Sequence, residues 1–222
     1  MSLAQRLRDH GLYLRGITGL TLRELETYGF PTEFTALALV GNAGSSYWPA
    51  FSSSAEYHDG AADPLDRWSR RIAASIATEF TLQPVYPFEG PPYYPFQQWA
   101  QRAESLAQSP IGVMMHPRYG LWHSYRFALL GREFDTEQAP PAASSLCIDC
   151  TAKPCLHACP VGAFDESGYD VERCAGYLTQ TPLAECHAGG CLARLACPIA
   201  PELRYIPAQG RFHLQAFLGA RG

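Results

Sequence analysis

The chain has 222 residues, of which 47% are hydrophobic and 17% are charged. This composition allows a buried core in one or two domains and excludes a disordered chain. The formal net charge is −4 and there is no basic run, so the positive stripe that nucleic-acid binding needs is missing and we expect no nucleic-acid partner.

The first residues predict a helix rather than a targeting signal. Residues 1–10 lack the continuous apolar stretch of a secretory signal and have the pattern of a short amphipathic helix. No apolar run approaches the roughly 18 residues of a membrane span. We therefore expect a cytoplasmic protein with no membrane partner. Farther along, residues 34–40 form a short apolar run closed by Gly41, which is typical of a buried strand.

Two helices are predicted next. Residues 64–80 carry the clearest helical pattern, with Asp63 as a natural N-cap and Pro64 in the first position. Apolar side chains recur there at steps of three and four residues, namely Leu65, Trp68, Ile72, Ile76 and Phe80. Residues 97–107 have a similar, shorter pattern and predict a second helix.

Strand-like runs follow at residues 111–115 and 121–130, joined by residues 116–120 with turn-forming residues at both ends. Residues 208–218 predict a last helix. Strands interleaved with helices indicate an α+β sandwich with one sheet.

Cysteines divide the chain into two parts. All eight lie between Cys147 and Cys197, and residues 1–146 contain none. The preceding segment, 132–145, is polar, aperiodic and proline-bearing, as linkers are. We therefore predict one domain over residues 1–140 and a cysteine domain over residues 141–222.

The cysteine spacing indicates iron–sulfur clusters. In a reducing compartment cysteines are more often ligands or catalytic thiols than disulfides. The first four have the spacing C-x2-C-x4-C-x3-C-P, close to the bacterial ferredoxin run, in which the cysteine before the proline ligates the second cluster. That crossover predicts one [4Fe–4S] cluster on Cys147, Cys150, Cys155 and Cys197, and another on Cys159, Cys174, Cys186 and Cys191. Two four-cysteine zinc sites are the alternative, because C-x2-C also opens zinc ribbons.

Two family resemblances follow from these motifs. Residues 147–198 resemble the ferredoxin-like domain of epoxyqueuosine reductases and corrinoid-dependent reductive dehalogenases, apart from the longer loop before Cys155. His-Pro-Arg-Tyr-Gly-Leu-Trp at 116–122 resembles a signature of CblC-type cobalamin-processing proteins, with weaker similarity over 35–51 and 63–80. Together they imply a nitroreductase-like sandwich with one sheet, which handles a corrinoid, followed by a bacterial ferredoxin-like two-cluster domain.

The resemblance also implies the site residues of the first domain. We predict His116 and Arg118 as catalytic residues in a pocket of corrinoid or flavin size, since imidazole can transfer a proton or face a metal and guanidinium suits phosphate or carboxamide groups. Tyr119, Trp122 and Tyr125 are the predicted cofactor-binding residues, although aromatic side chains on a strand are often ordinary core. For His116 the alternative is a turn histidine that only hydrogen-bonds the backbone.

These observations lead to competing functions. The first is an oxidoreductase in which two clusters reduce cobalamin, or less favourably flavin, and remove an upper axial ligand, with an electron donor protein and the corrinoid as partners. The second is a ferredoxin-type electron carrier without its own substrate. The third is a zinc-stabilised structural module.

Overall fold

The computed structural model describes residues 1–134, 146–165 and 168–221, which form two compact units. Unit 1 comprises the described residues of Met1–Ser105 and His123–Ala142, and unit 2 those of Leu106–Trp122 and Ala143–Gly222. The predicted boundary at residue 140 falls outside the described residues and remains a prediction. The segment from Leu106 to Trp122 groups with the cysteines, whereas the prediction assigned it to the first domain.

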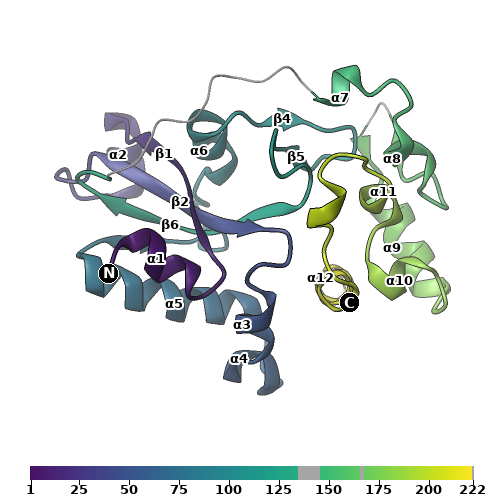
Figure 1. The fold of residues 1–222 in the computed structure, drawn as a ribbon, viewed down its shortest axis with the longest axis horizontal. Helices are drawn as coiled ribbons and strands as arrows, with labels where there is room; N and C mark the ends of the chain where they lie inside the picture. The colour runs from purple at the N-terminus through teal and green to yellow at the C-terminus, as the bar shows by residue number, and fades with distance from the viewer. Residues whose placement is uncertain (135–145, 166–167, 222) are drawn as a thin grey trace. The chain divides into compact units, whose positions relative to one another are not determined.

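Unit 1 is built on a four-stranded antiparallel sheet (Figure 1). Its strand order is β1 (Tyr13–Gly19), β2 (Ala36–Ala43), β6 (His123–Gly131) and β3 (Gln83–Val85). The predicted strands over 34–40 and 121–130 are confirmed as the two central strands. β2 is buried except at its two ends and β6 is buried from Phe127 to Gly131, as expected of strands covered on two sides.

Helices α5 (Pro64–Phe80) and α6 (Phe96–Ala103) cover opposite faces of this sheet. Neighbouring residues on a strand point to opposite faces. On β6, Arg126 bonds Asp66 and Ser69 of α5, while Tyr125 donates its hydroxyl to Glu104 at the end of α6. The sheet with helices on both faces confirms the α+β class. The other helices of unit 1 are α1 (Leu3–Arg8), α2 (Leu22–Tyr28), α3 (Trp48–Ser52) and α4 (Ala55–His58).

The predicted helix over 64–80 is confirmed, and Asp63 stands at its N-cap position as predicted, but the Asp63 side chain does not cap the helix. Asp63 has left-handed backbone angles (φ 51°, ψ 48°) and makes no capping hydrogen bond. An N-cap side chain needs an extended backbone to reach the first turn. The second predicted helix ends at Ala103, four residues earlier than expected, because Glu104 turns extended and its carboxylate bonds Arg15.

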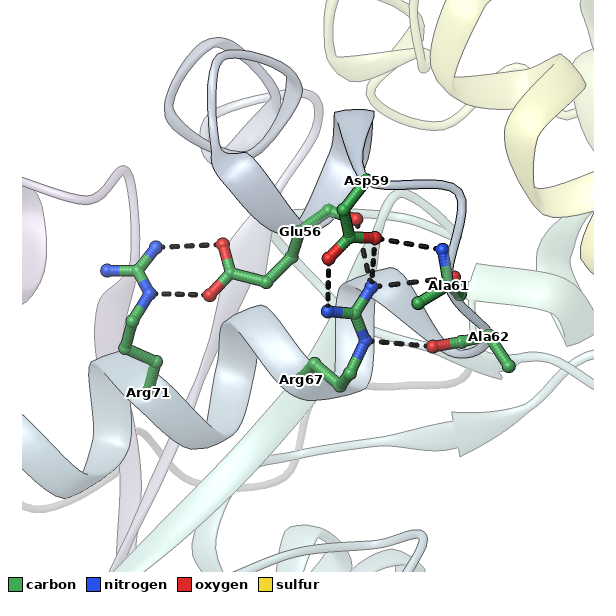
Figure 2. A network of polar contacts seen from close by, with 6 residues as sticks. All are labelled: Glu56, Asp59, Ala61, Ala62, Arg67 and Arg71. Atoms are coloured by element: carbon green, nitrogen blue, oxygen red, sulfur yellow. Dashed lines mark hydrogen bonds and ion pairs between the residues drawn. The ribbon is translucent and has the colours of Figure 1, made fainter.

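A polar network fixes the short helix α4 onto α5 (Figure 2). Arg71 forms two hydrogen bonds to the Glu56 carboxylate, at 2.5 and 3.0 Å. Arg67 bonds both oxygens of Asp59 at 2.7 Å, and also the carbonyl oxygens of Ala62 and Glu56. These contacts hold the turn before α5, where the backbone at Asp63 leaves regular structure.

Unit 2 consists of short elements. Its longest are α9 (Val171–Gln180) and α12 (Pro207–Gly219), and the second confirms the predicted last helix. The remainder are β4 (Ala107–Gln108), β5 (Met114–Met115), α7 (Leu146–Asp149), α8 (Pro154–His157), β7 (Phe164–Asp165), β8 (Gly168–Tyr169), α10 (Cys186–Gly189), α11 (Leu192–Leu195) and η1 (Pro201–Leu203).

The predicted strand over 111–115 shrinks to β5, because the chain turns just before it. The Gly112 N–H bonds the Ser109 carbonyl, and Gly112 has a left-handed φ of 78°. No helix within the described ranges is long and apolar enough to cross a membrane.

Candidate iron–sulfur site

The eight cysteines of unit 2 line two separate cavities, four in each. The first cysteine group consists of Cys147, Cys150, Cys155 and Cys197. The second cysteine group consists of Cys159, Cys174, Cys186 and Cys191. The cavities hold about 360 and 450 Å³ of space, openings included. These are the same two sets that the crossover in the spacing predicts.

Two short helices produce this division. Cys155 lies in the first turn of α8 and lines the first cavity, whereas Cys159 lies just past the end of α8 and lines the second. On α11 the order is reversed, since Cys191 precedes the helix in the second group and Cys197 follows it in the first. The two helices contact each other (Figure 1). Each helix therefore contributes one sulfur to each group.

Local sequence starts and stops these helices. Pro154 opens α8 directly after Lys153, which has a left-handed φ of 36°. Pro160 and Pro198 follow the crossing cysteines directly, and proline lacks the N–H that a continuing helix would need. Both helices are thereby limited to four residues, short enough for their ends to face different cavities.

The surroundings of both groups are apolar. The first cavity is completed by Ile111, Met115, Leu121 and Ile199, and the second by Val161, Phe164, Leu178, Leu192, Leu214 and Phe217. Burial raises the pKa of the thiols of Cys147, Cys155, Cys186, Cys191 and Cys197. Since thiolate is the ligand form of cysteine, a bound cation would have to compensate this cost.

Backbone N–H groups point at several of the sulfurs. The Ala163 N–H bonds the Cys159 sulfur at 3.3 Å. Similar bonds, which lower the pKa of the thiol, reach Cys186 from Leu192 and Cys197 from Ile199. Hydrogen bonds to sulfur are a main means by which proteins set the potential of iron–sulfur clusters.

Among residues 1–134, 146–165 and 168–221, no group of three or more Cys, His, Asp or Glu is arranged to hold one metal ion. A tetrahedral zinc ion needs its four sulfurs about 2.3 Å away. Here four cysteines line each of the two cavities.

The predicted catalytic residues lie in unit 2, in a tight turn. His116 and Gly120 exchange two backbone hydrogen bonds of 2.9 Å. The His116 Nδ1 accepts the backbone N–H groups of Arg118 (3.0 Å) and Tyr119 (3.1 Å), so the neutral ring carries its proton on Nε2. Arg118 is exposed and its guanidinium lies 5.6 Å from the Tyr119 ring centroid.

This turn lies beside the first cysteine group. Met115 and Leu121 flank it and line the first cavity. Gly120 is packed so closely that an added Cβ would stand 2.7 Å from the Ile199 carbonyl oxygen, two residues after Cys197. The turn therefore contacts the chain next to a predicted ligand, although neither His116 nor Arg118 lines the cavity itself.

The three predicted cofactor-binding aromatics are not brought together. Tyr119 stacks on His116, with ring centroids 4.3 Å apart. Trp122 lines a third cavity of unit 2. Tyr125 belongs to unit 1, where Glu104 accepts its hydroxyl and also pairs with the buried Arg15 at 2.9 Å.

Sequence reasoning missed two side chains near the second cysteine group. Arg194 lies over the rings of Trp122 and Tyr205, with its Cζ 5.1 and 4.5 Å from their centroids. Its signal was a charged residue inside the apolar run between Cys191 and Cys197. Tyr169 lines the second cavity, and burial together with a hydrogen bond to Cys174 raises the pKa of its hydroxyl.

Comparison with known proteins supports a shared fold. No family model matches the chain, and no curated protein matches it. Among solved structures, epoxyqueuosine reductase from Bacillus subtilis is 17% identical, with a TM-score of 0.51 over 94% of this chain and 69% of that one. The enzyme from Streptococcus thermophilus is 17% identical, with a TM-score of 0.48 over 90% and 68%. At this identity, the Bacillus subtilis structure establishes likeness of fold alone.

Proposed function

We propose that this chain is an iron–sulfur redox protein that holds two [4Fe–4S] clusters and passes single electrons to a corrinoid. One observation carries the cluster assignment. The cysteines form two groups of four that interleave across α8 and α11, as the crossover of two-cluster ferredoxins requires.

The chain's own residues have defined tasks in this proposal. The eight thiolates hold the clusters, which supply one-electron transfer when bound. Apolar residues such as Ile111 and Leu121 exclude water from the first group, and Phe164 and Leu178 do so for the second. The backbone N–H of Ala163 stabilises negative charge on the Cys159 sulfur.

The proposal of a corrinoid ligand depends on the motif at 116–122. The closeness of this turn to Ile199, next to the first cysteine group, supports electron delivery to a ligand held there. Because its Nδ1 accepts two backbone N–H groups, the neutral His116 ring carries its proton on Nε2, and proton transfer to a departing ligand is a task for imidazole. The competing function is an electron carrier without its own substrate.

The cluster proposal is tested by pairs of cysteine variants. Cys155→Ala with Cys197→Ala removes two ligands of one group, so we expect about half of the iron to remain after anaerobic reconstitution. Cys155→Ala with Cys159→Ala affects both groups, although these residues are four positions apart, and should leave almost none. Iron and sulfide analysis with electron paramagnetic resonance measures both. Equal losses in the two variants, or zinc in place of iron, would contradict the proposal.

The corrinoid is tested separately on the same reconstituted protein. Cobalamin should change its absorption spectrum on binding and lose its upper ligand under reducing conditions. His116→Ala should slow that loss about a hundredfold while leaving the cluster absorbance intact. If neither cobalamin nor flavin responds, the electron-carrier function takes its place.

A further inference from the structure

The third cavity of unit 2 has polar groups that the proposed function does not use. It holds about 510 Å³ of space, opening included, and we call it the Arg194 cavity. Trp122, Tyr205 and His213 provide its aromatic walls, and glycines at 189, 190 and 210 leave room beside them. Cys191, of the second cysteine group, lines it as well.

Arg194 brings a positive charge to this cavity that no carboxylate of the described residues compensates. One of its terminal nitrogens donates to the Leu121 carbonyl oxygen. Its Nε is buried and has no acceptor in the described part of the chain, and no described carboxylate pairs with it. A buried donor without an acceptor costs about 1–3 kcal/mol, and more where the group is charged.

A second unsatisfied donor stands next to it. The Trp122 side chain is 1% exposed, and its Nε1–H has no acceptor within the described ranges. The Cζ of Arg194 lies 5.1 Å from the centroid of the Trp122 ring, so the two side chains that carry these donors are neighbours in the wall of the cavity. Gln209, fully buried beside Gly210, also lacks partners for its amide within those ranges.

We propose that the Arg194 cavity binds an oxyanion, a carboxylate or phosphate group, through Arg194 and Trp122. The planar guanidinium fork matches the oxygens of either group, and the indole N–H adds a donor without charge. Such a ligand would supply the acceptors that the two buried donors lack. Neutral or cationic ligands would leave the charge of Arg194 uncompensated.

The position of Cys191 gives this site a consequence for redox chemistry. Cys191 lines both the Arg194 cavity and the second cavity, so an anion and a cluster would lie on either side of it. The negative charge of an anion beside Cys191 favours the oxidised form of a cluster that this cysteine holds. The anion should therefore make the midpoint potential of one cluster more negative and leave the other unchanged. This consequence rests on the proposed function, whereas binding of the anion does not.

Binding is tested by titrating the reconstituted protein with inorganic phosphate and, separately, acetate at constant ionic strength. Calorimetry and tryptophan fluorescence follow the titration. The wild-type protein should bind phosphate, acetate or both saturably. The anion with the lower Kd shows whether the cavity prefers a phosphate or a carboxylate group. Arg194→Gln should weaken the Kd at least about tenfold, and Trp122→Phe, which keeps a ring but removes the N–H, about threefold. Arg173→Gln, an exposed arginine of the same unit, should have the wild-type Kd.

Two further measurements keep the test decisive. Arg194→Lys keeps the charge and a donor for Leu121 but loses the fork, so it controls for folding and should still weaken binding. Absence of saturable binding to wild type, or an unchanged Kd in both Arg194→Lys and Trp122→Phe, overturns the proposal. Phosphate binding in a protein that holds no iron would support this site while removing the proposed function. A protein that holds iron but binds neither anion would support the proposed function and overturn the anion site.

Discussion

At the scale of single residues, the Glu56–Arg71 pair in Figure 2 makes stability depend on pH. Its hydrogen bonds lower the pKa of Glu56 from 4.5 to about 2. The unfolded chain takes up the proton near 4.5, so the pair stabilises unit 1 fully above that pH and loses its effect as pH falls toward 2. Arg71 is 55% exposed, and solvent should limit the contribution to about 1 kcal/mol.

Glu56→Gln should therefore lower the free energy of unfolding by about 1 kcal/mol near neutral pH and by less near about pH 3. Urea unfolding followed by tryptophan fluorescence measures this, since three of the four tryptophans lie in unit 1. Glu26→Gln, an exposed residue of α2, provides the control and should change neither value. An equal loss at both pH values would show that the effect does not arise from ionisation.

The residue scale also shows where sequence reasoning stops. The partition of the cysteines follows from spacing, because residues a few positions apart are confined by the short helices between them. The role of His116 does not follow in the same way. Its Nδ1 is occupied by two N–H groups of its own turn, a contact that a tight turn forms in any context. Which cavity such a turn faces depends on long-range packing.

At the scale of elements, the crossing of α10 and α12 depends on one glycine. A Cβ added at Gly210 would stand 1.9 Å from the Gly189 carbonyl oxygen. Backbone atoms cannot yield without moving a whole helix, so Gly210→Ala should destabilise unit 2 by about 2–3 kcal/mol. Thermal unfolding followed by circular dichroism measures the loss.

Gly176 is the matched control for this substitution. It lies inside α9, and an added Cβ there would meet no atom within 4 Å. Gly176→Ala should therefore stabilise the helix by about 0.5–1 kcal/mol. A loss of stability similar to that of Gly210→Ala would mean that both glycines act through flexibility rather than through the close approach.

The longer elements were the predictable ones. The helices over 64–80 and 208–218 and the strands over 34–40 and 121–130 all appear near their predicted ends. Shorter elements were shaped by side-chain contacts that sequence does not reveal. The pairing of Glu104 with Arg15 ended α6 early, and the turn at Gly112 removed most of a strand. Unit 2, whose elements mostly span two to four residues, was recognisable from its cysteines alone.

At the scale of the whole molecule, the two units differ in what stabilises them. Unit 1 buries large side chains, among them Trp68, Trp99, Phe51 and Phe127. The two cores of unit 2 are small and include the cysteines themselves, with Cys197 in one and Cys186 in the other. Where a hydrophobic core is small, the binding energy of a metal group contributes directly to the free energy of folding. Unit 2 should therefore depend on iron and unit 1 should not.

Removal of iron with an oxidant and a chelator should expose unit 2 to trypsin first. We expect early cleavage after Arg173 and Arg194, while Arg15 and Arg126 of unit 1 stay protected. Mass spectrometry of timed digests separates the two sets, and the iron-loaded protein provides the control. Simultaneous cleavage in both units would mean that they fold as one.

The exchange of sulfurs between α8 and α11 also sets an order for synthesis. Every member of the second cysteine group precedes Cys197 in the chain, whereas the first group begins at Cys147 and waits for Cys197 to be complete. A chain emerging from the ribosome can thus complete the second cysteine group while the first group still lacks Cys197. The four cysteines of the second group are contiguous within residues 159–191, whereas those of the first group lie on both sides of that segment, so the first group depends on the chain between Cys155 and Cys197 to bring its last member into place.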